Sequence, residues 1–244
     1  MERKTYILIV IFVFFICTLS GQNNLSIYKA YISGNMNNWK FSMDSIDAVG
    51  QKTDKELLDL INYQYGYIAW CIDKKFSVEA KRYLKKSLDN LKQLEEKNFE
   101  LSMVHAYKAA FVGFEIGLSP YKAPFIGPES LDNALKSLSL DSTNALGHIQ
   151  LGNIAYYTPR MFGGSKTNAF GHYLKALDIM EKNNKFMVQN WNYLNLLATL
   201  INAYIETDQY ELAKTYCIQA LEVEPEFEWV KNSLYPQVLK KLKQ

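Results

Sequence analysis

The sequence predicts an all-α fold built from antiparallel helix pairs, and three observations support this class. Between residues 144 and 180, apolar side chains recur at steps of three and four, the period of a helix with one buried side. Within that stretch Ala169, Tyr173 and Ala176 place small residues around a ring. This spacing lets two helices approach closely while the ring fills the gap one turn away. A similar spacing returns near the C-terminus, so we expect a helical hairpin to recur along the chain.

The clearest hairpin spans Asn144–Met180, and a second one spans Leu197–Pro225. A weaker copy lies at Asn62–Leu94. In the second hairpin Pro225 marks the end, because proline cannot continue a helix. The apolar stripe of the clearest hairpin's first helix consists of Leu146, Ile149, Leu151 and Ile154, and the second-helix positions of the C-terminal hairpin are Ala213, Cys217 and Ala220.

These positions, and the ending ALEVEP at residues 220–225, resemble the tetratricopeptide repeat (TPR), whose second helix shows the same Ala, aromatic, Ala spacing. The resemblance implies a right-handed α-solenoid of about five TPR-like antiparallel helix pairs plus a C-terminal capping helix. It also implies a scaffold that organises partners and does not catalyse. In such scaffolds the first helices line a groove, where asparagines hydrogen-bond the backbone of an extended peptide.

Further helices are expected at residues 25–33, 36–46, 53–71, 77–97, 101–118 and 129–140, with a capping helix at 227–239. Thr53 and Ser77 are expected to cap the helices that follow them. Residues 119–128 hold three prolines and are expected to form a stiff loop, with Pro128 in the first turn of the next helix. Tyr121–Gly127 is then a packed insertion or, alternatively, a lid over one end of the groove.

The loop Thr158–Lys166 interrupts the clearest hairpin. We expect the ring of Phe162 to cover the hairpin and Gly163–Gly164 to turn the chain with positive φ. Ser165 or Thr167 would then cap the second helix. An alternative interpretation is an anion site near a helix N-terminus, formed by the two cations of the loop, Arg160 and Lys166.

Residues 1–21 read as a secretory signal peptide, and residues 22–244 as one helical domain. Arg3 and Lys4 precede an apolar run from Tyr6 to Cys17, and a small polar tail follows it. The run is short for a membrane span, which takes about 20 apolar residues. We therefore expect an exported protein of the bacterial periplasm or cell envelope with no transmembrane span after cleavage. The alternative is an uncleaved N-terminal anchor.

The composition argues against a nucleic-acid partner, and it includes two cysteines outside the predicted signal segment. The formal net charge is only +2, which argues against the strong basic face that nucleic-acid binding needs. Cys71 and Cys217 both fall on apolar helix faces, where a thiol behaves as a small hydrophobe. We expect two core thiols, with a disulfide as the alternative.

No catalytic constellation is found, so the chain is predicted not to be an enzyme and to have no cofactor. HExxH, GxSxG, P-loop and dinucleotide patterns are all missing from the sequence. His148 and His172 flank the same hairpin and could meet, but two histidines alone make a poor metal site, so no metal site is predicted.

The predicted binding surface is the groove formed by the first helices. Asn153 and Asn202 occupy equivalent places in successive hairpins, and Asn195 lies two turns before Asn202 on the same face. Side-chain amides offer both a donor and acceptors and can read a peptide bond. The expected function is a non-catalytic scaffold for a peptide or protein partner. The alternative is a binder of a small molecule or lipid in an aromatic-lined pocket. The other groove residues are Tyr65, Tyr156 and Ile149.

Overall fold

The computed structural model describes residues 24–183 and 187–244. These residues are mostly helical and include no strand. The predicted signal segment lies outside the described residues. Within the described ranges, no helix combines the length and apolar character that crossing a membrane requires. After a helix at residues 24–32, the elements are α2 (Met36–Asp47), α3 (Asp54–Asp73), α4 (Ser77–Glu96), α5 (Leu101–Leu118), η1 (Pro120–Lys122), α6 (Ala123–Leu140), α7 (Ala145–Tyr157), η2 (Arg160–Phe162), α8 (Lys166–Glu181), α9 (Trp191–Ile205), α10 (Tyr210–Val223), the π-helical η4 (Val230–Leu234) and α11 (Tyr235–Lys241).

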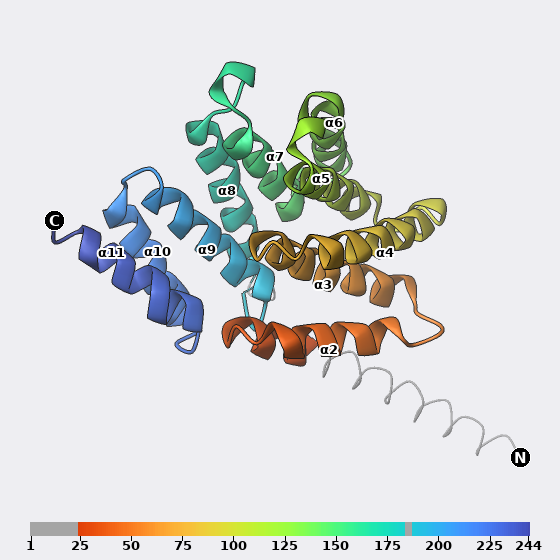
Figure 1. Cartoon of the computed structure of the whole chain (residues 1–244), viewed down its shortest axis with the longest axis horizontal. Coiled ribbons are helices and arrows are strands. Elements are labelled where there is room, and N and C mark those ends of the chain that lie inside the picture. The colour runs from red at the N-terminus through yellow and green to blue at the C-terminus, as the bar shows by residue number, and fades with distance from the viewer. Residues whose placement is uncertain (1–23, 184–186) are drawn as a thin grey trace, which may run out of the picture.

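Consecutive helices pack as pairs, which confirms the all-α repeat prediction. The main pairs are α3 with α4, α5 with α6, α7 with α8 and α9 with α10, and Figure 1 shows them following one another along an arc. The small residues that predicted close packing are fully buried, among them Ala176 and Ala220. Phe227, Val230 and Val238 are buried where η4 and α11 close the end of the last pair, as expected for a cap.

Two of the predicted helix starts have different outcomes. Thr53 caps α3 through a capping box: its side chain accepts from the Glu56 backbone N–H, and the Glu56 carboxylate accepts from the Thr53 backbone N–H. Ser77 is not a cap, because α4 already begins at that residue and its N-cap is Phe76. Lys75 adopts a φ of 62°, which completes the turn after α3 and brings the chain into α4 one residue early.

The stiff loop predicted at residues 119–128 is mostly helical, so that prediction was wrong. One 3-10 turn, η1, leads into α6 at Ala123, and Pro128 lies inside α6. A proline normally disfavours helical backbone in the preceding residue through a clash with its Cβ. Gly127 precedes Pro128 and has no Cβ, so the helix can run through both.

The α7–α8 connection turns largely as predicted. Gly163 has a φ of 92°, and Ser165 caps α8 by accepting from the Asn168 backbone N–H. Gly164 is needed for another reason: a Cβ there would lie 1.7 Å from the carbonyl oxygen of Thr158. Phe162 does not cover the hairpin. Its side chain is 71% exposed, because the short turn η2 leaves it on the outer side of the loop.

The arc closes on itself, which a simple solenoid does not do. The Tyr28 hydroxyl, on the helix at residues 24–32, donates to Glu224 at 2.7 Å, a residue 196 positions later. From the same helix, the Tyr31 hydroxyl donates to Asn195 at 3.1 Å, and its ring lies 5.3 Å from that of Phe227. The helix at residues 24–32 therefore packs against α9 and against the segment that links α10 to η4.

Cys71 and Cys217 are free and buried, which confirms two core thiols. Burial raises the pKa of the Cys71 thiol to about 11 and that of Cys217 to about 12. Both thiols are therefore protonated at neutral pH and poorly reactive.

Candidate functional site

The inner face of the arc is aromatic, with Tyr65 of α3 at its centre. The Tyr65 ring stacks on Phe114 of α5 with centroids 5.4 Å apart and meets Tyr107 edge to face at 5.9 Å. Trp191, at the start of α9, lies 6.3 Å away on another side. The helix at residues 24–32 and helices α2, α3, α5 and α9 thus contribute to one aromatic cluster, which we call the inner aromatic cluster: Tyr31, Trp39, Tyr65, Tyr107, Phe114 and Trp191.

A glycine makes room for the two indoles of this cluster. Trp39 and Trp191 meet edge to face at 4.9 Å, and both lie over Gly66 of α3. A Cβ at position 66 would approach each indole to 2.8 Å. Close contact between α2, α3 and α9 therefore depends on a residue without a side chain.

Two buried N–H donors beside Tyr65 have no hydrogen-bond partner among the described residues. They are the side-chain Nε2 of Gln150 on α7 and the indole Nε1 of Trp191. The two residues are only 3% and 2% exposed. Burial raises the pKa of Tyr65, and the nearby Gln150 amide acts to lower it; the Nε2 of Gln150 nevertheless has no partner in good hydrogen-bond geometry among the described residues. An unmet buried donor costs about 1–3 kcal/mol, so a ligand acceptor here would be favoured.

A polar chain runs from Gln150 along α7 towards α9. The Tyr173 hydroxyl donates to Asn153 Oδ1 at 2.9 Å, and Asn153 Nδ2 donates to Gln150 Oε1 at 3.2 Å. One turn further on, the Tyr156 hydroxyl donates to the Glu206 carboxylate. Of these bonds, the one from Tyr156 to Glu206 joins the α7–α8 hairpin to the α9–α10 hairpin.

The tyrosines of this face are built to stay protonated. Burial raises the pKa of Tyr156, and the carboxylate of Glu206 raises it further. Burial likewise raises the pKa of Tyr173. The Lys166 ammonium lies over the Tyr156 ring, and desolvation lowers its pKa despite Glu206, 3.9 Å away. At neutral pH these phenols donate and accept hydrogen bonds and do not act as bases.

The amides of the predicted groove residues are engaged in hydrogen bonds within the chain. Asn153 bonds to Tyr173 and Gln150, and Asn195 Oδ1 accepts from Tyr31. Asn202 Nδ2 donates to the Ala198 carbonyl oxygen of its own helix at 2.8 Å. The other three predicted residues pack: Tyr65 and Tyr156 are buried, and Ile149 lies against the main core.

Gln150 and Trp191 were harder to predict as site residues from the sequence than these asparagines. A weak signal existed for Gln150, a polar residue between Ile149 and Leu151 of the apolar stripe. Trp191 is brought to Tyr65 only by the curvature of the arc, which local periodicity does not encode.

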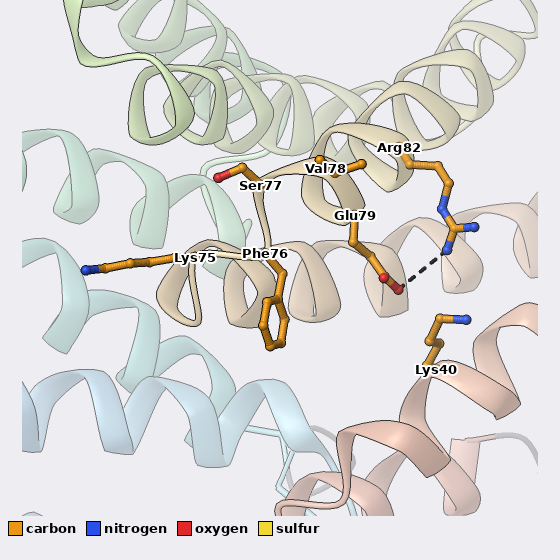
Figure 2. Close-up of a pocket in the computed structure, with 7 residues that line it drawn as sticks. All are labelled: Lys40, Lys75, Phe76, Ser77, Val78, Glu79 and Arg82. Atoms are coloured by element: carbon orange, nitrogen blue, oxygen red, sulfur yellow. Dashed lines mark hydrogen bonds and ion pairs between the residues drawn. The ribbon is translucent and has the colours of Figure 1, made fainter.

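An open cleft of about 630 Å³ lies outside the inner face, where the α3–α4 turn faces α2. Figure 2 shows Arg82 reaching Glu79 across its wall, while the Lys75 side chain extends away from them. Phe76 is 51% exposed and packs edge to face on Trp70 at 5.4 Å. The full lining is Lys40, Lys75, Phe76, Ser77, Val78, Glu79 and Arg82.

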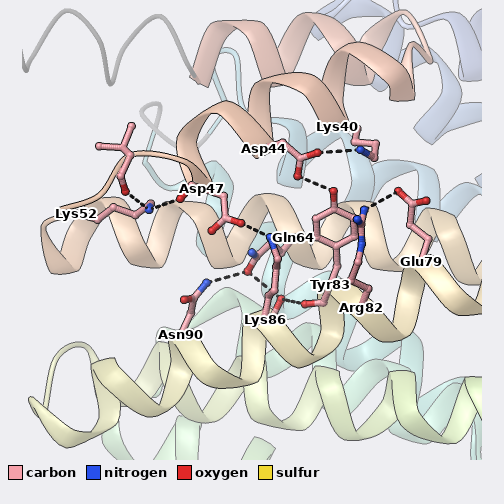
Figure 3. A network of polar contacts seen from close by, with 12 residues as sticks. Lys40, Asp44, Asp47, Lys52, Gln64, Glu79, Arg82, Tyr83, Lys86 and Asn90 are labelled. Atoms are coloured by element: carbon pink, nitrogen blue, oxygen red, sulfur yellow. Dashed lines mark hydrogen bonds and ion pairs between the residues drawn. The ribbon is translucent and has the colours of Figure 1, made fainter.

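A polar network beside this cleft fixes α2 to α3 and α4 (Figure 3). The Tyr83 hydroxyl donates to Asp44 at 2.6 Å, and Lys40 pairs with Asp44 at 2.8 Å. Burial acts to raise the pKa of Asp44, but the bonds from Lys40 and Tyr83 outweigh it and lower the pKa. Gln64 of α3 is fully buried; its Oε1 accepts from Ser87 and Asn90 of α4, and its Nε2 has no hydrogen-bond partner among the described residues. This network is structural.

Comparisons with known proteins bear on the fold of this chain and leave the chemistry of its candidate site open. No family model and no curated protein matches the sequence. Among solved structures, the chain is similar to the HusA haemophore from Porphyromonas gingivalis, with a TM-score of 0.55 and 16% sequence identity. The match covers 75% of this chain and 86% of the haemophore chain. At this identity the likeness concerns the fold.

Proposed function

We propose that this protein binds a small, largely apolar molecule that carries a hydrogen-bond acceptor such as a carboxylate, at the inner aromatic cluster. The unmet N–H donors of Gln150 and Trp191 carry this proposal, because both are buried against Tyr65. A ligand that places an acceptor there would meet both donors while its apolar part lies against the rings.

An extended peptide in an open groove has less support. A groove of the TPR type needs amides free to pair with a peptide backbone. Here Asn153 and Asn195 are bonded to tyrosines of the same chain, and the helix at residues 24–32 covers part of α9. The proposed scaffold is still TPR-like and exported, as the sequence suggests, but its inner face is filled with rings.

Porphyrins are the first ligands to test. The structurally similar protein is a haemophore, and a porphyrin combines a flat apolar face with two carboxylates. Flat rings stack well on aromatic side chains such as Tyr65 and Phe114. Since both donors are covered in this structure, binding requires neighbouring rings to move, so indole fluorescence should change.

The test is a titration of tag-free protein with haem and with protoporphyrin IX, followed by porphyrin absorbance and tryptophan fluorescence. We expect saturable binding of both. Gln150→Leu and Trp191→Phe each remove a donor and should weaken binding about 10-fold or more, the loss expected for a hydrogen bond to a charged group. Gln93→Leu, on the exposed face of α4, is the matched control and should bind normally.

Two outcomes would count against the proposal. One is that none of three ligands, haem, protoporphyrin IX and a long-chain fatty acid titrated in the same way, binds saturably. The other is binding that Gln150→Leu and Trp191→Phe leave unchanged. Capture of a protein that is lost in the Asn153→Ala, Asn202→Ala double variant would instead support the peptide groove.

A further inference from the structure

Two imidazoles meet where α7 packs on α8, on a different side of α7 from the inner aromatic cluster. The ring centroids of His148 and His172 lie 6.1 Å apart, and their planes are inclined by 30°. The hairpin holds them in register, because Gly152 lets the Tyr173 ring lie directly on α7 and Tyr173 bonds to Asn153. The separation is therefore set by a rigid contact between two helices.

The hydrogen bonding of His148 defines which of its nitrogens is free. Nε2 lies 3.1 Å from the carbonyl oxygen of Ser142, and a carbonyl oxygen can only accept, so Nε2 carries the proton. In the neutral ring Nδ1 then holds a lone pair. That atom is buried and has no partner among the described residues. Metal-ligating histidines show the same arrangement, since the other ring N–H usually donates to a backbone carbonyl or a carboxylate.

His172 is suited to the same role. Its side chain is half-buried, and within the described ranges no hydrogen bond is found for its ring. His105 differs, because its Nδ1 is already bonded to Asn133 at 2.8 Å.

We propose that His148 and His172 together bind a divalent transition-metal ion of the Cu²⁺, Ni²⁺ or Zn²⁺ type. Imidazole suits these ions. With metal–nitrogen bonds of about 2.0–2.1 Å, two imidazoles on one ion have ring centroids about 5–6.4 Å apart, a range that includes the observed separation. Among the described residues no third histidine, cysteine or carboxylate joins them, so water or a small ligand fills the remaining positions. Such a site is open to an external ligand.

Thermal unfolding of tag-free protein with added CuCl₂ or ZnCl₂ tests this site, with no porphyrin present. At a free metal concentration about a hundredfold above Kd, the midpoint should rise by about 5–10 °C. His148→Gln and His172→Gln should each abolish most of the rise, whereas His105→Gln should keep it. Equal rises in wild type and His172→Gln would overturn the proposal, as would no rise with either metal in the wild type.

Electron paramagnetic resonance of the Cu²⁺ protein supplies a readout independent of stability. We expect nitrogen coupling from two imidazoles in the wild type and in His105→Gln. His172→Gln, whose side chain is partly exposed, should fold by circular dichroism and show coupling from one imidazole at most. A spectrum unchanged by His172→Gln would show that the ion lies elsewhere.

Discussion

Replacing Gly152 by alanine should destabilise the protein, although alanine is the better helix former. The added Cβ would lie 2.5 Å from Cε1 of Tyr173, whose ring is 1% exposed and has no free space to enter. Overpacking of this kind costs about 1–3 kcal/mol. Displacing the ring also weakens its hydrogen bond to Asn153, worth about 1 kcal/mol.

The helix preference of alanine over glycine offsets about 0.5–1 kcal/mol of this loss. The net destabilisation is then about 2 kcal/mol, or a fall of about 4–8 °C in the melting midpoint for a chain of this size. Gly171, on the partner helix α8, is the matched control: it is exposed, and a Cβ there meets no atom within 4 Å. Gly171→Ala should therefore stabilise by about 0.5–1 kcal/mol.

The assay is thermal and urea unfolding of the two variants and the wild type, followed by circular dichroism at 222 nm. Opposite signs for the two Gly→Ala changes are expected. If Gly152→Ala equals or exceeds the wild type in stability, the close packing of α7 on the Tyr173 ring is refuted, and with it the rigid spacing of the histidine pair.

Three other expectations follow from buried or capping groups. Ala220→Asp places a charge where no side-chain surface is exposed and should abolish cooperative unfolding by circular dichroism; retention of the wild-type midpoint would contradict the repeat packing. Thr53→Ala removes the cap shared with Glu56 and should cost about 1 kcal/mol in urea unfolding, whereas Thr53→Ser should cost little. Below its ordinary pKa of 6.5, His172 takes up a proton more readily in the unfolded chain than in the folded one, because desolvation and His148 lower its folded pKa. The free energy of unfolding should therefore fall between about pH 7 and about pH 5, and it should fall less steeply in His172→Gln than in the wild type. The same dependence on pH in both proteins would show that His172 is not its cause.

Much of the fold was predictable because it depends on residues close in sequence. Helix periodicity, the N-cap at Thr53 and the small residues at 169 and 176 act over one to three turns, and each was found where expected. The errors were local as well. Gly127 allows a helix to run through Pro128, and a tight turn leaves Phe162 in solvent. The presence of a proline therefore did not end the helix, and the apolar character of phenylalanine did not bury its ring.

The candidate site could be predicted only in part. The asparagine spacing predicts a shared face, but the hydrogen bonds of Asn153 and Asn195 depend on Tyr173 and Tyr31, which lie on other helices. For the same reason the sequence could suggest that His148 and His172 meet, but not their distance or which nitrogen is free.

Paired helices with apolar contacts between them could be predicted from the sequence, because apolar residues recur in it every three or four positions. The closing of the arc could not be predicted in this way, since the Tyr28–Glu224 contact joins residues 196 positions apart. Closure follows from the summed curvature of all the helix pairs, to which each pair adds a small rotation. That curvature brings Trp191 to Tyr65 and leaves two buried donors facing the rings.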